Sequence, residues 1–454
     1  MTQYSKEEIA LLKQSVKKIW MDFRQMQEFE QNPVIVCEGN GIKVKTIDGR
    51  EFIDAISGAV VTGIGYSNEK VKEAIKKQTD ELCWWPVLHA TTPPALNLAR
   101  LITELLPGDL NTAFLLSGGS EATECAMKMA RQYHIQTGNP LKTKIVSRYW
   151  SYHGSTKGAL SASGVSDKYK FDPFLAGHIH IFPPYCYRCP FKQSPEECDL
   201  ECALALEQVI RYEGRDTVSA VIVDPVLAAV GILVPPKEYY RRIREICHKT
   251  DVLLVFDEVL TGFGRTGSLF ACNHYDVVPD IICLGKGISG GYQPLAATVA
   301  CDKVVRAFRG KNADNVAFMH GNTFGGHPIA CAAGTAAIEE LLRLNLVENS
   351  RIMGSYLREE CLRLQEKYAF IGDVRGLGLL VGIEMVQDKN RKTLFPSKKA
   401  LVPKLIAKAM ERGIITRGSH HVWHLAPPLI ITKTEIDEVV EILDNCMSEI
   451  QQEL

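Results

Sequence analysis

The sequence has no excess of charge of one sign and no long apolar run. Its 454 residues carry 52 Lys and Arg against 53 Asp and Glu, a formal net charge of −1. The composition therefore argues against a broad basic surface for nucleic acid and against an acidic tail. No apolar segment reaches the ~20 residues that a membrane-spanning helix needs. The chain also contains no internal repeat, no low-complexity tract and no Ser/Gly-rich linker.

We also expect no secretory leader at the N-terminal end of this sequence. The N-terminal stretch MTQYSKEEIALLKQSVKKIW mixes charged and apolar residues and lacks the apolar core of a signal peptide. We therefore expect a cytoplasmic protein with no membrane and no nucleic-acid partner. Because the chain is long and 46% hydrophobic, we expect a large core shared by two domains in one compact unit.

The 14 cysteines do not indicate a disulfide framework. Several fall inside apolar segments, where reduced cysteine packs as a small core residue. One cluster stands apart in YCYRCPFKQSPEECDLEC: Cys186 and Cys189 have C-x-x-C spacing, and Cys198 and Cys202 are one helical turn apart. A structural metal site or a redox pair is open on this spacing. The short loop between the two pairs favours ordinary reduced cysteines, and we assign no metal ligand.

Two apolar runs in the middle of the chain each lead to a charged residue. Residues 252–256 form a short unbroken run, typical of a strand buried on both faces, and Asp257 follows it. Residues 281–284 lead to Lys286 in a glycine-rich loop. Because open α/β sheets bind ligands at the carboxyl ends of their strands, we expect both side chains at the tips of neighbouring strands. A lysine for a Schiff base and an acid for a pyridine nitrogen suit pyridoxal phosphate.

A candidate anion site lies in AFLLSGGSEATECAMKMARQYH. Residues 113–116 predict a strand, residues 117–120 a tight glycine turn, and Glu121 onward a helix with an apolar face. A strand, a turn and a helix start in this order direct free backbone N–H groups at an anion. Taken alone, an ordinary helix cap is the better interpretation of these residues.

Together, these motifs resemble the class III, or omega, pyridoxal-phosphate aminotransferases. DEVLTGFGRTG, which begins at Asp257, and LGKGISGG around Lys286 match the signature of this family, and further family motifs follow in order over nearly the whole chain. The chain looks most like the omega-amino acid and amine:pyruvate aminotransferases. The resemblance implies an α/β protein of the PLP-dependent transferase fold type I, with a mostly parallel central sheet in a large domain and a smaller α+β domain from both chain ends.

The resemblance also implies the domain boundaries. We expect residues 1–60 to form the N-terminal part of the small domain, residues 61–335 the large PLP-binding domain, and residues 336–454 the C-terminal small domain. The local patterns agree: IVCEGNGIKVKTIDGREFIDAIS predicts a meander of short antiparallel strands. Ser5 to about Phe29 predicts a helix that starts with a capping box. The C-terminal part mixes strands and helices without the rhythm of a parallel sheet.

For the cofactor, the resemblance implies a site drawn from several segments. Lys286 and Asp257 are the implied catalytic residues. Tyr152 stacks on the cofactor ring with His153 beside it, since an aromatic ring adds apolar contact and leaves the reacting carbon open; a packed core tyrosine is the alternative. The implied cofactor-binding residues are Gly118, Gly119, Ser120, Tyr152, His153, Asp257, Val259, Lys286 and Thr323. Thr323 matches a threonine that reaches the cofactor phosphate of the neighbouring subunit, which implies a homodimer, or a tetramer, with shared active sites.

For the substrate, the implied residues are Arg417, Val60 and Trp85. Arg417 occupies the position of an arginine that receives the substrate carboxylate, for which a guanidinium suits because it binds bidentately and stays charged. A surface arginine is the alternative. Val60 stands where several amine:pyruvate enzymes carry a tryptophan, and Trp85, with Trp84, is placed to rebuild part of the pocket wall.

The sequence therefore predicts a transaminase. It moves an amino group from an omega-amino acid or amine to a 2-oxo acid, with pyridoxal 5'-phosphate bound through a Lys286 Schiff base. Asp224, where many family members have glutamate, and His424, where ornithine-type relatives place an arginine, weakly favour pyruvate over 2-oxoglutarate. Two alternatives stay open: a racemase or aminomutase of the same fold, and a non-enzymatic metal-binding protein with the cysteine cluster as its site.

Overall fold

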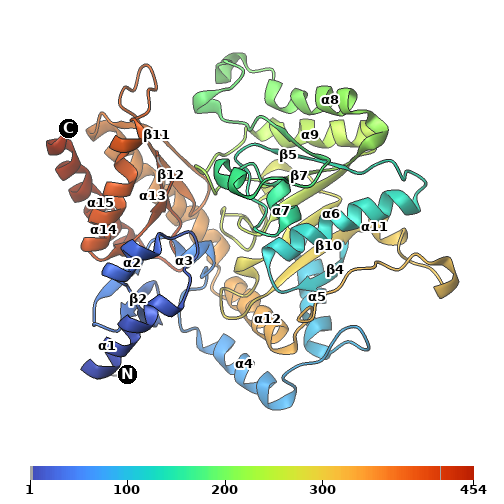
Figure 1. Ribbon diagram of the computed structural model, residues 1–454, viewed down its shortest axis with the longest axis horizontal. Coiled ribbons are helices and arrows are strands. Elements are labelled where there is room, and N and C mark those ends of the chain that lie inside the picture. Colours follow the sequence, from blue (N-terminus) through green and yellow to red (C-terminus); the bar gives the residue numbers. More distant parts are fainter. Residues whose placement is uncertain (1–3, 420) are drawn as a thin grey trace.

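A seven-stranded sheet forms the centre of the computed structural model, which describes residues 4–419 and 421–454 (Figure 1). The strand order is β4-β10-β9-β8-β7-β5-β6. Strands β9, β8, β7, β5 and β6 are parallel, and β10 runs against both of its neighbours. The strand bounds are β4 Leu110–Leu116, β5 Lys144–Arg148, β6 His178–Ile181, β7 Val218–Val223, β8 Leu253–Glu258, β9 Ile281–Leu284 and β10 Ala296–Cys301.

The central strands are apolar because both faces of the sheet are covered. Every residue of β7, β8, β9 and β10 is buried. Helix α6 (Gly119–Gln136) packs against β9 and β10, and helix α9 (Lys237–Thr250) against β8. The unbroken apolar runs of the sequence thus predicted these strands correctly, as parallel sheets require. The other helices beside this sheet are α4 Glu69–Glu81, α5 Pro93–Leu105, α7 Lys157–Ala162, α8 Glu201–Glu213, α10 Cys272–Tyr275, α11 Asp302–Arg306 and α12 Pro328–Arg343.

Two four-stranded sheets lie to one side of the central sheet (Figure 1). One has the order β1-β2-β3-β13, and the other, which is antiparallel throughout, β11-β12-β15-β14. Because β13 pairs in parallel with β3, the two ends of the chain share one sheet. The α/β fold with a smaller α+β part is therefore confirmed, and the residue boundaries of the domains stay a prediction. The strands are β1 Val36–Asn40, β2 Lys43–Thr46, β3 Glu51–Asp54, β11 Ile371–Gly376, β12 Val381–Met385, β13 Ile414–Ile415, β14 Arg417–Gly418 and β15 Val422–Leu425.

The N-terminal helix is shorter than expected. Its capping box is present: the backbone N–H of Glu8 donates to Ser5 Oγ at 3.1 Å, and Ser5 N–H donates to a Glu8 carboxylate oxygen at 2.7 Å. Helix α1 nevertheless ends at Ser15, and a second helix, α2, starts only at Met26. Between them Phe23 has a φ of 54°, in the left-handed region, which interrupts a right-handed helix. The single helix from Ser5 to about Phe29 was therefore a wrong prediction.

The remaining helices follow the sequence pattern more closely. Within the described residues no helix has both the length and the apolar character needed to cross a membrane. The cytoplasmic location stays a prediction. The bounds not yet given are α3 Ser57–Val60, α13 Leu346–Lys367, α14 Leu401–Glu411 and α15 Lys433–Glu453.

Candidate active site

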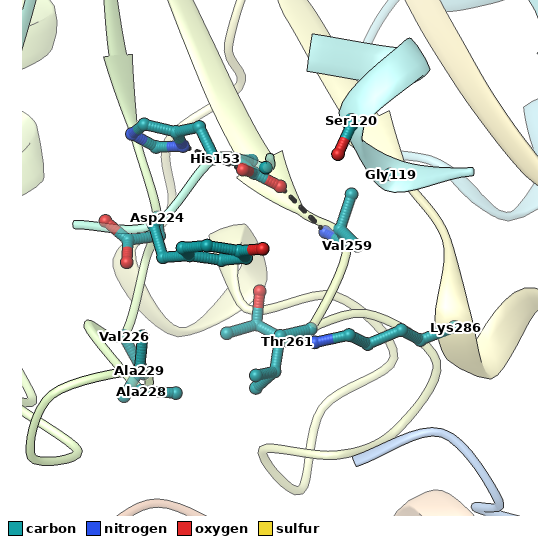
Figure 2. Close-up of a pocket in the computed structure, with 14 residues that line it drawn as sticks. Gly119, Ser120, His153, Asp224, Val226, Ala228, Ala229, Val259, Thr261 and Lys286 are labelled. Atoms are coloured by element: carbon teal, nitrogen blue, oxygen red, sulfur yellow. Dashed lines mark hydrogen bonds and ion pairs between the residues drawn. The ribbon is translucent and has the colours of Figure 1, made fainter. Parts of the chain in front are cut away.

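A cavity of about 210 Å³ opens at the carboxyl ends of the central strands. This is the edge where parallel α/β sheets place their ligands, because the loops there converge and backbone groups are free. Figure 2 shows Lys286 entering the cavity from the side opposite Asp224 and His153. The lining residues are Gly119, Ser120, Tyr152, His153, Gly154, Asp224, Val226, Ala228, Ala229, Asp257, Val259, Leu260, Thr261 and Lys286.

Asp257 is the acid of this cavity, and its carboxylate is held on both oxygens. It is the last residue but one of strand β8, and it is 5% exposed. His153 Nδ1 lies 2.7 Å from Oδ2 and donates to it, since a carboxylate can only accept. The backbone N–H of Val259 donates to Oδ1 at 3.1 Å. The carboxylate is therefore fixed in one orientation.

His153 is itself anchored on the backbone. Its N–H donates to Ser163 Oγ at 2.8 Å, and its carbonyl accepts from Thr123 Oγ1 at 2.7 Å. The ring is buried, and its Nε2 has no hydrogen-bond partner among the described groups. A fixed imidazole with one ring nitrogen committed to Asp257 thus forms one wall of the cavity.

Lys286 lies two residues beyond the end of β9 and supplies the amine of the cavity. Its φ of 45° lies in the left-handed region, a strained backbone of the kind that concentrates at functional sites. Burial lowers the pKa of Lys286 to about 8, against the opposing attraction of Asp257, and Arg417 and Arg265 lower it further. Part of the amine is therefore unprotonated near neutral pH, as a nucleophile or a general base requires.

The glycine turn lies at the start of α6, and Gly118 is its N-cap. No side chain caps this helix, so its first N–H groups are free for a ligand. A Cβ on Gly119 would lie 2.7 Å from Cγ1 of Val259, so only glycine fits between the turn and β8. Ser120 Oγ accepts from the N–H of Ser155 at 3.0 Å. The helix begins at Gly119 rather than at Glu121, two residues earlier than expected.

Asp224 also lines the cavity, and its partner is a residue that the sequence analysis missed. Arg148, the last residue of β5, donates from Nη2 to Asp224 Oδ1 at 2.9 Å, and its side chain has no exposed surface. The only signal in the sequence was a charge at the end of the short strand segment KIVSR. Asp224 therefore pairs inside the large sheet and not with an arginine of the C-terminal part.

Comparison with known proteins gives this geometry a family. The model of the family described as aminotransferase class-III matches residues 25–447. The chain belongs to the class III aminotransferases. It is 37% identical over 459 residues to the taurine–pyruvate aminotransferase of Bilophila wadsworthia, covering 99% of each chain. It is 35% identical over 437 residues to an adenosylmethionine-8-amino-7-oxononanoate aminotransferase of Geobacter sulfurreducens, covering 94% of this chain and 95% of the relative.

A solved structure agrees with this assignment. A thermostable (S)-enantioselective omega-transaminase of Thermomicrobium roseum superimposes with a TM-score of 0.93 at 35% identity, covering 99% of this chain and 100% of that one. The chain is therefore an enzyme of amino transfer to a 2-oxo acid, in a family that depends on pyridoxal phosphate. The non-enzymatic alternative is wrong.

Five expected residues of this class III aminotransferase do not line the cavity of its own chain: Gly118, Thr323, Trp85, Val60 and Arg417. Thr323 is exposed and lines a separate hollow of about 550 Å³, where its carbonyl accepts from Trp84 Nε1 at 3.3 Å. Trp85 is 41% exposed. Gly118 lies in the glycine turn without lining the cavity, and a Cβ there would meet nothing within 4 Å. The remaining cofactor-binding candidates all line the cavity.

Val60 and Arg417 approach the cavity from the smaller sheets. Val60 packs against the apolar cluster that includes Val226 and Ala228 of the cavity wall. Arg417 is exposed on β14 and forms no ion pair with a described residue. Its charge still acts on Lys286, whose pKa it lowers. In the register of the antiparallel strands, Arg417 lies opposite His424.

His424 is uncharged although it lies opposite Arg417 in the sheet. Burial lowers the pKa of His424 to about 3, and the charges of Arg417 and Arg375 lower it further. The imidazole is therefore neutral at physiological pH. Its Nε2 is buried without a hydrogen-bond partner among the described groups.

The cysteine cluster lies away from the cavity. Cys186, Cys189, Cys198 and Cys202 are free thiols. Burial raises the pKa of Cys202 to about 12, and the other three thiols raise it further, so the four lie near one another. In the described part of the chain, no three His, Cys, Asp or Glu side chains are arranged to hold a metal ion.

Proposed function

We propose that this chain is a pyridoxal-phosphate-dependent aminotransferase that moves the amino group of an omega-amino acid or amine to pyruvate. The observation that carries the proposal is the pairing of Lys286 and Asp257. An amine with a pKa of about 8 and a fixed carboxylate face the same cavity from neighbouring strand ends. This is the pair that the aldehyde and the pyridine nitrogen of the cofactor require.

The residues around the cavity fit the remainder of pyridoxal phosphate. The uncapped N-terminus of α6, with Gly119 and Ser120, suits the phosphate group. Tyr152 and Val259 line the cavity as apolar surfaces for the ring. When bound, the cofactor withdraws electrons from the substrate carbon that carries the amino group. Each part of the cofactor thus has a chemically suited group in this chain.

Lys286 is the residue that moves the proton. Its amine would hold the cofactor, which would supply the electron sink of the reaction. With its pKa lowered to about 8 by burial, the same amine would take the proton from the substrate carbon that carries the amino group and would deliver it in the second half of the transfer. A single flexible side chain could therefore carry out both proton transfers.

Asp257 holds a proton on the pyridine nitrogen throughout. His153 and the Val259 N–H fix its two oxygens, so the acid cannot rotate away. A fixed carboxylate costs no reorganisation when charge develops on the ring. His153 therefore acts on the cofactor through Asp257 and through the wall that it forms.

The substrate end of the cavity favours one acidic group at a distance from the amine. Val226, Ala228 and Leu260 make this wall apolar. Arg417 has no ion-pair partner among the described residues, so it is free to bind a carboxylate or a sulfonate bidentately. Such groups are found in β-alanine, 4-aminobutyrate and taurine, and the similarity to a taurine–pyruvate aminotransferase supports this choice.

Pyruvate is the acceptor that fits the charges. The 2-oxoglutarate acceptor carries two carboxylates and needs a second free cation. Arg148 is bound to Asp224, and His424 is neutral, so among the described residues near the cavity neither supplies that charge. Pyruvate carries a single carboxylate, for which Arg417 is sufficient.

A second copy of the chain completes the proposal. Thr323 lies outside the cavity of its own chain, near exposed apolar side chains that include Trp84, Met319 and Phe324. An exposed patch of this kind marks an interaction surface. In a homodimer this surface places Thr323 at the cofactor phosphate of the partner. Light scattering should give the mass of a dimer, or of a tetramer of such dimers.

An absorbance spectrum tests the function directly. Purified protein, loaded with pyridoxal phosphate, should show the visible band of a lysine-bound cofactor. Taurine, β-alanine, 4-aminobutyrate and simple amines are then added one at a time without a 2-oxo acid. We expect at least one donor to bleach the band stably and pyruvate to restore it. A band that no donor bleaches would favour the racemase or aminomutase, and the absence of any band would overturn the proposal.

A further inference from the structure

Arg148 is a buried charge that the proposed reaction does not use. Besides the 2.9 Å contact with Asp224 Oδ1, its Nη2 donates to the Asp224 carbonyl, and its Nη1 donates to Tyr240 Oη at 3.0 Å. The Tyr240 hydroxyl in turn donates to the carbonyls of Asp224 and Pro225, both at 3.0 Å. The guanidinium carbon also lies 5.8 Å from the centre of the Tyr239 ring. The Arg148 side chain is therefore locked onto the end of β7.

The register of the sheet explains why a cation is needed here. Val223 of β7 pairs with Phe256 of β8, so the next residues, Asp224 and Asp257, lie at the same level on neighbouring strand ends. Both side chains line the cavity, and Figure 2 shows Asp224 in its wall. Two carboxylates at neighbouring positions repel each other, and burial adds to the cost. Burial raises the pKa of Asp224, Arg148 and His153 lower it, and Asp257 raises it again.

His153 interacts with both acids but forms a hydrogen bond with only one of them. Its Nδ1 donates to Asp257, and its charge also acts on Asp224. Arg148 occupies Oδ1 of Asp224 at 2.9 Å. With this guanidinium in place, the imidazole is left to Asp257, and Asp257 keeps the orientation that faces the cavity.

We propose that Arg148 is a positioning residue of the active site: by pairing with Asp224, it directs His153 to Asp257 and balances the charge of the second acid beside the cofactor. This rests on the proposed function, because the charge at risk is the one that acts on the bound pyridoxal phosphate. Asp224 lines the cavity beside Asp257, and Arg148 lies behind Asp224 without lining the cavity. Neither touches the reacting atoms.

Asp224 and Arg148 should both change the pKa of the nitrogen through which Lys286 would hold the cofactor. A negative charge nearby raises the pH at which that nitrogen loses its proton, and a positive charge lowers it. Removing Asp224 and removing Arg148 must therefore have opposite effects, and removing both must cancel. The other titratable or charged groups that face this region are His153, Asp257, Lys286, Cys283, Tyr239, Tyr240, Tyr275, Arg265 and Arg417; all are unchanged in the variants.

The test compares Asp224→Asn, Arg148→Met and the double variant in the cofactor-loaded enzyme. The readout is the midpoint of the pH-dependent change in the visible band, which is measured without turnover. We expect Asp224→Asn to lower the midpoint and Arg148→Met to raise it, each by about half to one pH unit, with the double variant close to wild type. Arg148→Lys, which keeps the charge, should stay near wild type. Asp224→Asn should lower kcat more than it changes KM.

Arg244→Met is the matched control. Arg244 forms an ion pair with Asp280 at 2.8 Å, near the opposite end of β9, so its loss should lower Tm and leave the midpoint in place. If Arg148→Met does not fold, Asp224→Asn and the double variant still decide the sign. Shifts in the same direction for both single variants, or losses of Tm with no shift, would overturn the positioning role. Wild-type protein that takes up no cofactor would overturn the proposed function itself and this inference with it.

Discussion

The two ends of the candidate active site are built in different ways. The cofactor end stands on the tips of β7, β8 and β9, where every strand residue is buried. The proposed substrate end draws on Val60, Trp85 and Arg417, which come from a short helix, a loop and an edge strand and are partly or fully exposed. The backbone of a strand in the middle of a sheet is hydrogen-bonded on both sides, and this fixes the direction of its side chains. An edge or a loop leaves the same kind of side chain free to adapt.

The residues proposed to carry out the reaction therefore lie on different elements from those proposed to select the substrate. Residues that move protons have to be fixed within a fraction of an ångström, so they lie on rigid elements. Residues that select a substrate can lie on segments that change between relatives without cost to the core. The similarity to both a taurine–pyruvate and an adenosylmethionine-8-amino-7-oxononanoate aminotransferase, at 37% and 35% identity, fits this division.

The largest effect should come from the cofactor end, with Lys286→Ala. Without the amine neither the bond to the cofactor nor the proton transfer is possible, so we expect turnover to fall by about 10⁴-fold or more. The change removes a side chain that lines a cavity, so the fold should persist. The rate at which the donor is converted to its oxo product, with pyruvate as acceptor, measures the loss. Activity within about tenfold of wild type would remove Lys286 from its assigned role.

Asp257→Asn should have the next largest effect, because the amide keeps the shape of the acid and loses its charge. We expect kcat to drop by about 10²-fold with KM much less affected, since the carboxylate stabilises charge that develops during the reaction. Steady-state kinetics with a fixed donor separate the two constants. A change confined to KM would contradict the assignment and point to a binding role.

At the substrate end, Arg417→Leu should affect acidic donors selectively. Loss of a charged hydrogen-bonding partner is worth about 1.5–3 kcal/mol, or roughly 10- to 100-fold in kcat/KM for an omega-amino acid. Simple amines, which carry no acid group, serve as the internal control and should change little. Equal losses for both donor classes would show that the arginine acts on the fold or on the cofactor.

The same variant makes a prediction about pH. The Arg417 charge lowers the pKa of Lys286, so its removal raises that pKa above about 8. The rate depends on the unprotonated amine and rises as the pH passes through its pKa, so the rising limb of the pH–rate profile should move to higher pH. Profiles of kcat with a simple amine donor measure this shift. A limb that stays in place would mean that another group controls it.

The smallest effect is expected from the glycine turn, where two neighbouring residues differ. Gly119→Ala places a Cβ 2.7 Å from Val259 Cγ1, and this overpacking should cost about 1–3 kcal/mol and weaken phosphate binding. Gly118→Ala is the matched control, since its Cβ meets nothing within 4 Å and its φ of −158° suits any residue. Thermal unfolding and cofactor affinity should separate the two variants. Equal behaviour would contradict the close approach.

Much of the fold was predictable because the central strands are buried on both faces. An unbroken apolar run such as residues 252–256 is best buried as a strand covered on both faces. The pattern alone therefore predicted β8 and β9 as neighbouring strands. The N-terminal helix was mispredicted because α1 buries none of its residues. Without a core to face, its periodicity could not show where the helix breaks, and the left-handed Phe23 interrupts it.

The sequence by itself determined the chemistry, because Asp257, the glycine turn and Lys286 are each tied to a strand end that their own neighbours specify. Only the tertiary structure decided which groups meet. Residues 75 positions or more apart form the pairs His153–Asp257 and Arg148–Asp224, and no local pattern records them. It also left Thr323 and Trp85 outside the cavity. The end of a strand can be seen in the local sequence, as where Gly285 follows the apolar run of β9, whereas the partners of a buried charge depend on the register of the whole sheet.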